Sequence, residues 1–241
     1  MNIKYIIIDY DGTLSFEDSS LNLDAAQAIQ KAQKSELEII FASGRSSIEM
    51  FSLATFLGTK RVSIGENGGV VQKGPNDFLL LGNIKDPLIA YDKLSKTIEN
   101  VTLMNTIPRL TEIVLERTFD INKGIECIKQ DNIQVELIDS QFSYHLQNNY
   151  VNKGTALKRV QKMLGITKEN CVGIGDSITD IPLFEQCEYS ISVKNSLDVV
   201  KKKTDYVTKS ERGYGAKEAI CLLYTSPSPR DQRGSRMPSS A

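Results

Sequence analysis

The sequence has few of the features that build zinc sites, disulfide frameworks or membrane spans. Its four cysteines are far apart and form no CxxC pair, so we expect reduced thiols: Cys127, Cys171, Cys187 and Cys221. No stretch approaches the roughly 20 apolar residues that cross a bilayer. The apolar run near the N-terminus is too short for a signal peptide and is interrupted by Asp9. These absences predict a cytoplasmic protein with no membrane partner.

The chain also lacks an excess of charge of either sign. It has 29 basic and 30 acidic residues, for a net charge of -1. A nucleic-acid partner is therefore not expected, because such proteins carry a strongly basic surface. The 241 residues, 40% of them hydrophobic, suit a globular protein of one large domain or two small ones.

A short apolar run that stops at two carboxylates stands out near the start of the chain. Residues 5–8 (YIII) show no alternation, which favours a parallel strand covered on both faces. Asp9 and Asp11 follow, and we expect them to project together because residues two apart in an extended segment point to the same side. Two like charges held so close need a cation, a shared proton or a cationic side chain. Taken alone, an ordinary turn explains the pair equally well.

Strands and helices alternate through residues 1–83 and again from residue 152, which predicts one doubly wound, Rossmann-like α/β domain with a parallel sheet. Asp24 or Asn22 is the expected N-cap of the first helix. A hairpin is expected across residues 74–77. The expected strands are 5–8, 38–42, 61–64, 171–174, 189–193 and 206–207, and the expected helices are 24–34, 46–57, 153–164 and 197–202.

Residues 84–151 have a different pattern, which predicts a small inserted α+β unit. Helices are expected near 87–100 and 122–129, and strands near 112–117, 134–138 and 143–147. The α/β domain is therefore expected in two parts, residues 1–83 and 152–220. Residues 221–241 are rich in Pro, Ser and Arg without a hydrophobic period. We expect them to be disordered and not native, because they resemble translated adaptor sequence.

Polar groups follow several of the expected strands and a helix start, and parallel strands bring their carboxyl ends to one edge. These groups are Asp9, Asp11, Ser43, Lys153, Asp176 and Asp180. Surroundings that are rich in oxygen but poor in His and Cys select a hard cation, and a site for phosphate oxygens and waters favours Mg²⁺ over Ca²⁺. Simpler roles remain open: Ser43 as a helix N-cap, Lys153 as a solvated surface lysine, and the last two acids as a cap and a first-turn acid.

Four segments, DYDGTL, ASGR, NKG and GDSITD, resemble in order the four motifs of the haloacid dehalogenase superfamily of phosphatases. The insertion is similar to the type 2 cap of that superfamily, and the likeness runs over residues 2–219. Within the superfamily, GENGG, the small cap and FSYHLQN look most like archaeal-type phosphoglycolate phosphatases, a group also similar to sucrose-phosphate phosphatases.

The resemblance implies a role for each motif residue. Asp9 is expected to attack phosphorus and form an aspartyl-phosphate. Asp11 is expected to protonate the leaving alkoxide and then to deprotonate the hydrolytic water. Ser43 and Gly44, with Lys153, are expected to bind the phosphate oxygens.

The resemblance also implies a Mg²⁺ site. Its expected ligands are the Asp9 side chain, the Asp11 backbone carbonyl and Asp176, with Asp180 as a ligand through water or as a holder of the site.

Four further residues are candidates for substrate contacts. Arg109 is able to meet a substrate carboxylate through two hydrogen bonds, although surface arginines are common. His145, the single histidine, either contacts substrate or packs beside Tyr144. Glu66 and Asn67 either touch the substrate or shape the turn that contains them.

The sequence thus predicts a Mg²⁺-dependent phosphomonoesterase for a small phosphorylated metabolite, with 2-phosphoglycolate as the first choice by resemblance. The alternatives are a sugar-phosphate phosphatase similar to the sucrose-phosphate enzymes, and a phosphomutase that returns the phosphoryl group to its substrate. A phosphorylatable switch similar to receiver domains is disfavoured, because those domains lack a cap. Either a monomer or a homodimer is compatible with the sequence.

Overall fold

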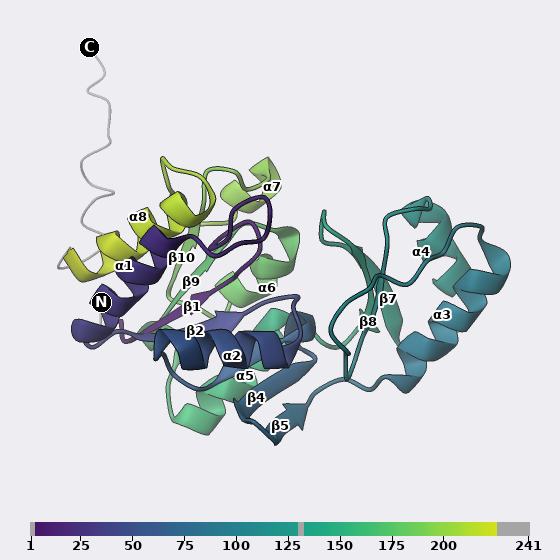
Figure 1. Ribbon diagram of the computed structural model, residues 1–241, viewed down its shortest axis with the longest axis horizontal. Helices are drawn as coiled ribbons and strands as arrows, with labels where there is room; N and C mark the ends of the chain where they lie inside the picture. Colours follow the sequence, from purple (N-terminus) through teal and green to yellow (C-terminus); the bar gives the residue numbers. More distant parts are fainter. Residues whose placement is uncertain (1–2, 130–132, 226–241) are drawn as a thin grey trace, which may run out of the picture.

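The computed structural model describes residues 3–129 and 133–225. These residues form two parts that lie side by side (Figure 1). The larger part contains the beginning and the end of the described chain, and the smaller part carries α3 (Lys85–Thr97), α4 (Ile121–Lys129), β7 (Val135–Asp139) and β8 (Tyr144–Asn148). We call the larger part the core and the smaller part the cap.

An eight-stranded sheet forms the centre of the core, with the strand order β11-β10-β9-β1-β2-β3-β4-β5. The strands are β1 (Tyr5–Ile8), β2 (Glu38–Ala42), β3 (Ser63–Gly65), β4 (Val70–Gly74), β5 (Asp77–Leu80), β9 (Cys171–Gly175), β10 (Tyr189–Ser192) and β11 (Tyr206–Val207). Strand β1 pairs in parallel with both β2 and β9, whereas β4 and β5 form an antiparallel hairpin at one edge. The predicted doubly wound, largely parallel sheet is confirmed.

Helices cover both faces of this sheet, which explains the unbroken apolar run of β1. Ile6 and Ile8 pack in one cluster with α1 (Leu23–Lys34), α2 (Ser47–Leu57) and α8 (Arg212–Thr225). Ile7 packs in a second cluster with α5 (Lys153–Leu164) and α6 (Ile181–Phe184). All three isoleucines are fully buried. The remaining helix of the core, α7 (Asp198–Lys201), is a single turn near the β11 edge.

Local sequence signals set the helix ends. The side chain of Asn22 accepts a hydrogen bond from the backbone N–H of Ala25 at 3.0 Å, so Asn22 rather than Asp24 is the N-cap of α1. Gly58 ends α2 with φ of 68°, a left-handed conformation that costs glycine little.

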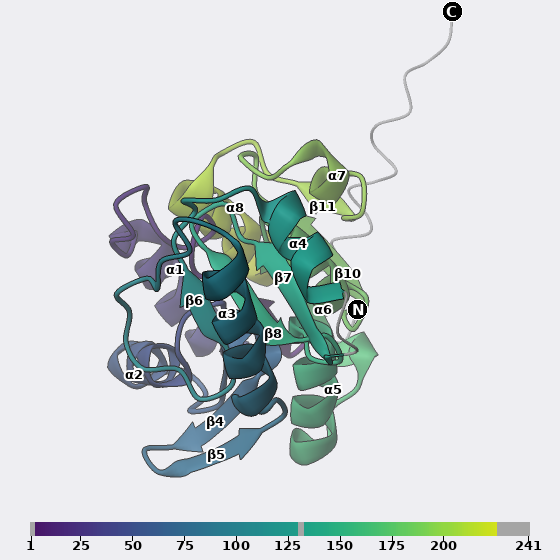
Figure 2. The same cartoon turned by 90° about the vertical axis from the view of Figure 1, so that its right-hand side faces the viewer.

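The cap is a three-stranded antiparallel sheet in the order β6-β8-β7, where β6 is Ile113–Leu115. Helices α3 and α4 cover its outer face, in front of the sheet in Figure 2. Tyr144 and Leu146 of β8 pack in the cluster that contains these helices, while His145 between them takes the opposite face of the strand. That opposite face lies toward the core.

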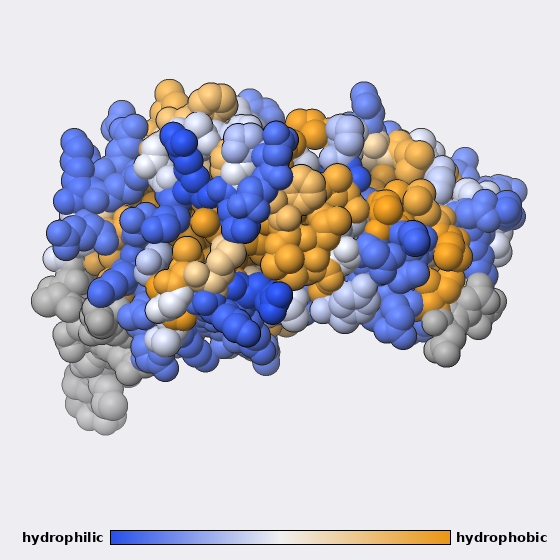
Figure 3. All heavy atoms as spheres, turned by 90° about the horizontal axis from the view of Figure 1, so that it is seen from below, coloured by the Kyte–Doolittle hydropathy of each residue, from blue (hydrophilic) through white to orange (hydrophobic). Residues whose placement is uncertain are grey.

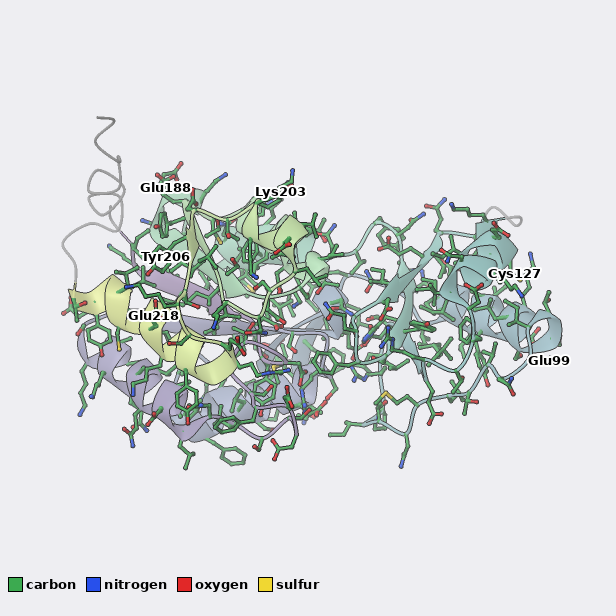
Figure 4. All side chains as sticks on the ribbon, turned by 90° about the horizontal axis from the view of Figure 1, so that it is seen from above. Glu99, Cys127, Glu188, Lys203, Tyr206 and Glu218 are labelled. Atoms are coloured by element: carbon green, nitrogen blue, oxygen red, sulfur yellow. The ribbon has the colours of Figure 1, made fainter. Side chains whose placement is uncertain are left out.

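Helix α8 corrects the sequence interpretation. The predicted disordered tail begins at residue 221, but α8 continues to Thr225, so that boundary is wrong. Ala219 and Ile220 are fully buried, and Leu223 packs against the same cluster. Figure 4 shows Glu218 of this helix near Tyr206 of β11, whose hydroxyl donates to it at 3.2 Å. The rest of the predicted tail, residues 226–241, lies outside the described residues.

The surface seen from below mixes hydrophilic residues with smaller apolar patches (Figure 3). Among the described residues, no helix combines the length and the apolar character needed to cross a membrane.

The burial of α8 generates a stability prediction. Ile220→Ala should lower the free energy of unfolding by about 2–5 kcal/mol, because it removes buried methylenes and leaves a cavity. Lys217→Ala, on the same helix, removes a half-exposed ion pair with Asp24 and should change it by less than about 1 kcal/mol. Urea unfolding measures both, and equal effects of the two substitutions would contradict the packing of α8 on the core.

Candidate active site

A cavity of about 460 Å³ lies between the carboxyl edge of the core sheet and the inner face of the cap. The core contributes Asp9, Ser43 and Lys153 to its wall, and the cap contributes Arg109 and His145. The predicted convergence of groups that are distant in sequence therefore occurs at this edge, as expected for an open α/β sheet.

A buried lysine links two carboxylates on the cavity floor. Lys153 is the first residue of α5 and is 2% exposed. Its Nζ donates to Asp9 Oδ1 at 2.7 Å and to Asp180 Oδ1 at 2.6 Å. Burial raises the pKa of Asp9 well above its usual value, and the charge of Lys153 opposes that rise. The alternative of a solvated surface lysine is wrong.

The loop after β9 supplies Asp180 and a third carboxylate, Asp176. Asp180 Oδ2 accepts hydrogen bonds from the backbone N–H groups of Asp176 and Ser177, at 3.0 and 2.9 Å. Asp180 thus fixes the loop with one oxygen while the other binds Lys153. Asp176 Oδ1 accepts from Thr13 Oγ1 at 3.0 Å. Burial, followed by the nearby charge of Asp180, raises the pKa of Asp176 to about 7.

These carboxylates fit a divalent cation. Asp9, Asp176 and Asp180 each offer one oxygen, and the three oxygens lie within 4.8 Å of one another. Burial and then the charges of neighbouring acids raise the pKa values of Asp9 and Asp176, and a bound cation would oppose that rise. Because all the donors are oxygens, the site suits a hard cation such as Mg²⁺.

Asp11 does not join this cluster. Arg45 binds its carboxylate through two hydrogen bonds of 2.8 Å, from Nε to Oδ2 and from Nη2 to Oδ1. Asp9 and Asp11 line the same cavity, but only Asp9 lies in the acidic cluster. The strand ends at Ile8, and the N–H groups of residues 13–15 donate to the carbonyl of Tyr10. Asp11 still lines the cavity, at its more exposed edge.

Arg45 itself was not singled out from the sequence, although it directly follows the predicted pair Ser43 and Gly44. Besides Asp11, it binds Glu49 at 3.2 Å, and its guanidinium lies 4.7 Å from the centre of the Tyr10 ring. Its position in the ASGR segment was the available signal.

The loop after β2 is held in place mainly by hydrogen bonds to its backbone carbonyls. Ser43 is buried and its Oγ accepts from the N–H of Arg45 at 3.2 Å. Ser43 is not the N-cap of α2, because Ser46 caps that helix in a capping box with Glu49. Three successive carbonyls of the loop are bound: Ser43 O by Asn67 N–H at 3.1 Å, Gly44 O by Arg109 Nη1 at 2.6 Å, and Arg45 O by Glu66 N–H at 2.8 Å.

The turn that contains Glu66 and Asn67 also binds the cap. Both residues have left-handed φ values, 53° and 50°, which are uncommon outside glycine. The Glu66 carboxylate accepts from the backbone N–H groups of Leu110 and Thr111 and from Thr111 Oγ1, at distances of 2.8 to 3.1 Å. Glu66 is therefore a core-to-cap contact and does not line the cavity. Burial raises its pKa, and the charge of Glu112 adds to that rise.

A second acid in the cap, Glu112, organises the remaining candidates. Its Oε1 accepts from Arg109 Nη1 at 2.8 Å, and its Oε2 lies 2.9 Å from His145 Nδ1. Asn67 Nδ2 lies 3.2 Å from the same His145 nitrogen. Although burial opposes ionisation of Glu112, His145 and Arg109 lower its pKa. No sequence pattern distinguished Glu112 from the other acids of the cap.

Comparisons with known proteins give one consistent family. A family model described as haloacid dehalogenase-like hydrolase matches residues 6–101 and 82–220. A phosphoglycolate phosphatase from Nitrosopumilus maritimus is 36% identical over 224 residues, which cover 92% of this chain and 97% of the relative. One from Archaeoglobus fulgidus is 36% identical over 221 residues, with 91% and 96% covered.

Solved structures show the same fold. A Thermoplasma acidophilum protein superimposes with a TM-score of 0.83 at 22% identity and covers 93% of this chain and 99% of its own. A haloacid dehalogenase-like hydrolase from Bacteroides thetaiotaomicron gives a TM-score of 0.75 at 17% identity, with 92% and 99% covered.

The buried lysine generates a prediction on stability and pH. Lys153→Met should lower the free energy of unfolding by about 3–5 kcal/mol at pH 7, because two carboxylates lose their buried counter-charge. Without the charge of the lysine, the folded-state pKa of Asp9, which burial already raises, lies still further above its unfolded value. The loss should therefore be small below about pH 4 and grow as the pH rises toward 7.

Urea unfolding of Lys153→Met and of the wild type, at pH 5 and pH 7 with a chelator present, measures this difference. Lys158→Met, at an exposed position on the same helix, is the matched control and should show neither effect. A destabilisation by Lys153→Met that does not depend on pH would argue against the ion pairs.

Proposed function

Because the chain belongs to the haloacid dehalogenase-like hydrolases, we propose that it is a phosphatase that hydrolyses phosphate monoesters through a covalent intermediate on Asp9. The observation that carries the proposal is the position of this carboxylate. Asp9 lies on the floor of the cavity, 4% exposed, with one oxygen bound to Lys153. A buried carboxylate next to a cation and open to a cavity is suited to attack a bound phosphoryl group.

In the first step, an oxygen of Asp9 forms a bond to phosphorus while the bond from phosphorus to the ester oxygen breaks. The leaving alkoxide takes a proton, and the product is an aspartyl-phosphate. In the second step, water attacks phosphorus, gives up a proton, and releases inorganic phosphate and the free carboxylate of Asp9. Lys153 stabilises the negative charge of the phosphoryl group in both steps, and its bond to Asp180 keeps it in place.

Asp11 is proposed as the group that donates the proton and later accepts one. It lines the cavity two residues from Asp9, but its carboxylate is bound to Arg45. For proton transfer to the alkoxide, Asp11 must exchange at least one of these two bonds for contact with the substrate. Arg45 keeps its second partner, Glu49, and so remains in position when Asp11 turns.

We propose that Mg²⁺ completes the site. Asp9 and Asp176 would hold it with the backbone carbonyl of Asp11, and Asp180 would hold it directly or through water. When bound, it would offset the charge of the phosphate oxygens as they approach the carboxylates. The loop of Ser43 and Gly44 lines the cavity and would bind the remaining phosphate oxygens, since its carbonyls are already occupied. The Ser43 N–H donates to the carbonyl of Ile64, so the Ser43 hydroxyl and the Gly44 N–H are the proposed donors.

We propose 2-phosphoglycolate as the substrate. The support is the name that the relatives carry, at 36% identity over nearly their whole length. The cavity of about 460 Å³ suits a small ester, and the cap contacts at Glu66 and Arg109 cover it. A covered site limits the access of water to the aspartyl-phosphate until the product leaves.

The nucleophile generates a prediction on activity. Asp9→Asn should reduce phosphate release from 2-phosphoglycolate on the order of 10⁴-fold or more, because an amide oxygen cannot form the intermediate. Chelation of divalent cations should abolish the wild-type rate, and Mg²⁺ should restore it. Asp198→Asn, at a carboxylate that is 90% exposed on α7, is the control and should leave the rate unchanged. Phosphate release that persists in Asp9→Asn means that another group is the nucleophile.

The proton donor generates a second prediction, which depends on the leaving group. Asp11→Asn should slow formation of the intermediate about 10²- to 10⁴-fold with 2-phosphoglycolate, whose leaving alkoxide needs a proton. The same step should change much less with p-nitrophenyl phosphate, whose leaving group departs as a stable anion. Rapid-quench measurement of the first turnover separates this step from hydrolysis of the intermediate. Equal losses with both esters would rule out Asp11 as the acid.

A further inference from the structure

We propose that Arg109 is the receptor for a carboxylate group of the substrate, so that the enzyme selects short phosphorylated acids over phosphate esters without an acid group. This inference rests on the proposed phosphatase function and adds the residue that reads the rest of the substrate. It is drawn from the guanidinium's position, its hydrogen bonds and the charges around the cavity.

The position of the guanidinium is fixed from two sides. Arg109 Nη1 donates to the carbonyl of Gly44 at 2.6 Å and to Glu112 Oε1 at 2.8 Å. The side chain is 10% exposed and lines the cavity. Because one bond goes to the core and the other to the cap, the guanidinium is held where the two parts meet.

One donor of this guanidinium has no partner. Arg109 Nε is buried, and within residues 3–129 and 133–225 it donates to nothing. A buried donor without a hydrogen bond is unfavourable, so a ligand that supplies an acceptor there binds more tightly than its other contacts alone would allow. Since Nε is covered by protein atoms, a ligand reaches it only by displacing some of them.

In the same cavity, Arg45 shows how the edge of a guanidinium formed by Nε and one Nη binds a carboxylate. It binds both oxygens of Asp11 through Nε and Nη2, each at 2.8 Å. A carboxylate is the group that matches this fork, because its two oxygens have the spacing of the two parallel N–H bonds. A substrate carboxylate would meet the corresponding edge of Arg109 in the same way.

The distribution of charge points to Arg109 rather than to the other cations of the cavity. Arg45 already binds the carboxylates of Asp11 and Glu49, and Lys153 binds those of Asp9 and Asp180. Arg109 binds only the acid Glu112 among the described residues, and it shares that acid with His145. Of the three cations, Arg109 therefore has the fewest carboxylate partners and is the one best placed to bind another.

The contact with Gly44 also limits the length of the ligand. Arg109 touches the carbonyl next to Ser43, in the loop proposed to hold the phosphate. The carboxylate must therefore lie close to the phosphate, with a short carbon chain between them. A single methylene, as in 2-phosphoglycolate, meets this requirement, whereas hexose phosphates offer no acid group to Arg109.

The first test compares two esters of equal length on the intact protein. In 2-hydroxyethyl phosphate, a hydroxymethyl group replaces the carboxylate of 2-phosphoglycolate. The wild type should prefer 2-phosphoglycolate by roughly 30- to 1,000-fold in kcat/KM, the range for a buried charge pair that loses one partner. Arg109→Met should abolish most of that preference, by lowering kcat/KM for 2-phosphoglycolate much more than for 2-hydroxyethyl phosphate.

Two further variants keep the result interpretable. Arg117→Met removes a cap arginine that pairs with Asp139 outside the cavity, and it should leave the preference intact. Arg109→Lys keeps the charge but not the fork, so it should retain part of the preference. Melting temperatures of all variants identify any that are unfolded, and the wild-type comparison needs no variant.

The outcomes separate this inference from the proposed function. A wild type that hydrolyses both esters equally well, or an Arg109→Met variant that loses the same factor on both, overturns the receptor role while the phosphatase stands. The second of these results would assign Arg109 to holding Gly44. No phosphate release from any ester by the metal-loaded wild type overturns the proposed function itself.

Discussion

The buried ion pairs of Lys153 are the constraint on which the rest of the site depends. A lysine that is 2% exposed is stable only with counter-charge, and its two partners come from opposite ends of the core sequence, Asp9 after β1 and Asp180 after β9. The sheet order places β1 beside β9, which brings these partners together. Gly154 lets α5 approach closely, since a Cβ there would overlap the carbonyl of Pro182. The core must therefore be assembled before the ion pair between Lys153 and Asp9 can form.

Direct hydrogen bonds join the cap to the loop that contains Ser43, Gly44 and Arg45. Of the three bound carbonyls in that loop, two are held by the turn at Glu66 and Asn67, and the middle one is held by Arg109 of the cap. The same turn binds the backbone of the cap through the Glu66 carboxylate. Because both contacts involve residues 109–111, a displacement of this segment would release Gly44 as well. Cap position and loop geometry are thus coupled through a few hydrogen bonds.

The sequence predicted the residues that obey a rule of regular structure and missed those that depend on tertiary contacts. Asp9, Lys153 and Asp180 were predicted together because the carboxyl ends of parallel strands share one edge, and the structure brings them together. The ion pair of Asp11 with Arg45 was not predicted, because it joins two loops that are 34 residues apart in the sequence. Glu112 was missed because its role depends on groups from three separate segments, which no local pattern reveals. The predicted start of the tail fell inside helix α8 because it was placed from amino-acid composition, which does not reveal which residues are buried.

The charges of the cavity predict one orientation for the proposed substrate, a phosphorylated acid. The floor carries three carboxylates, Asp9, Asp176 and Asp180, against one lysine, Lys153, so further negative charge is unfavourable there. An anionic group can approach this floor only together with a divalent cation, and phosphate oxygens are the better ligands for a hard cation such as Mg²⁺. In the proposed complex, the carboxylate of the substrate then lies on the cap side, where the guanidinium of Arg109 would bind it. The two anionic groups of the proposed substrate are thus told apart: the phosphate by its affinity for the metal at the floor, and the carboxylate by the hydrogen-bond geometry of Arg109 at the cap side.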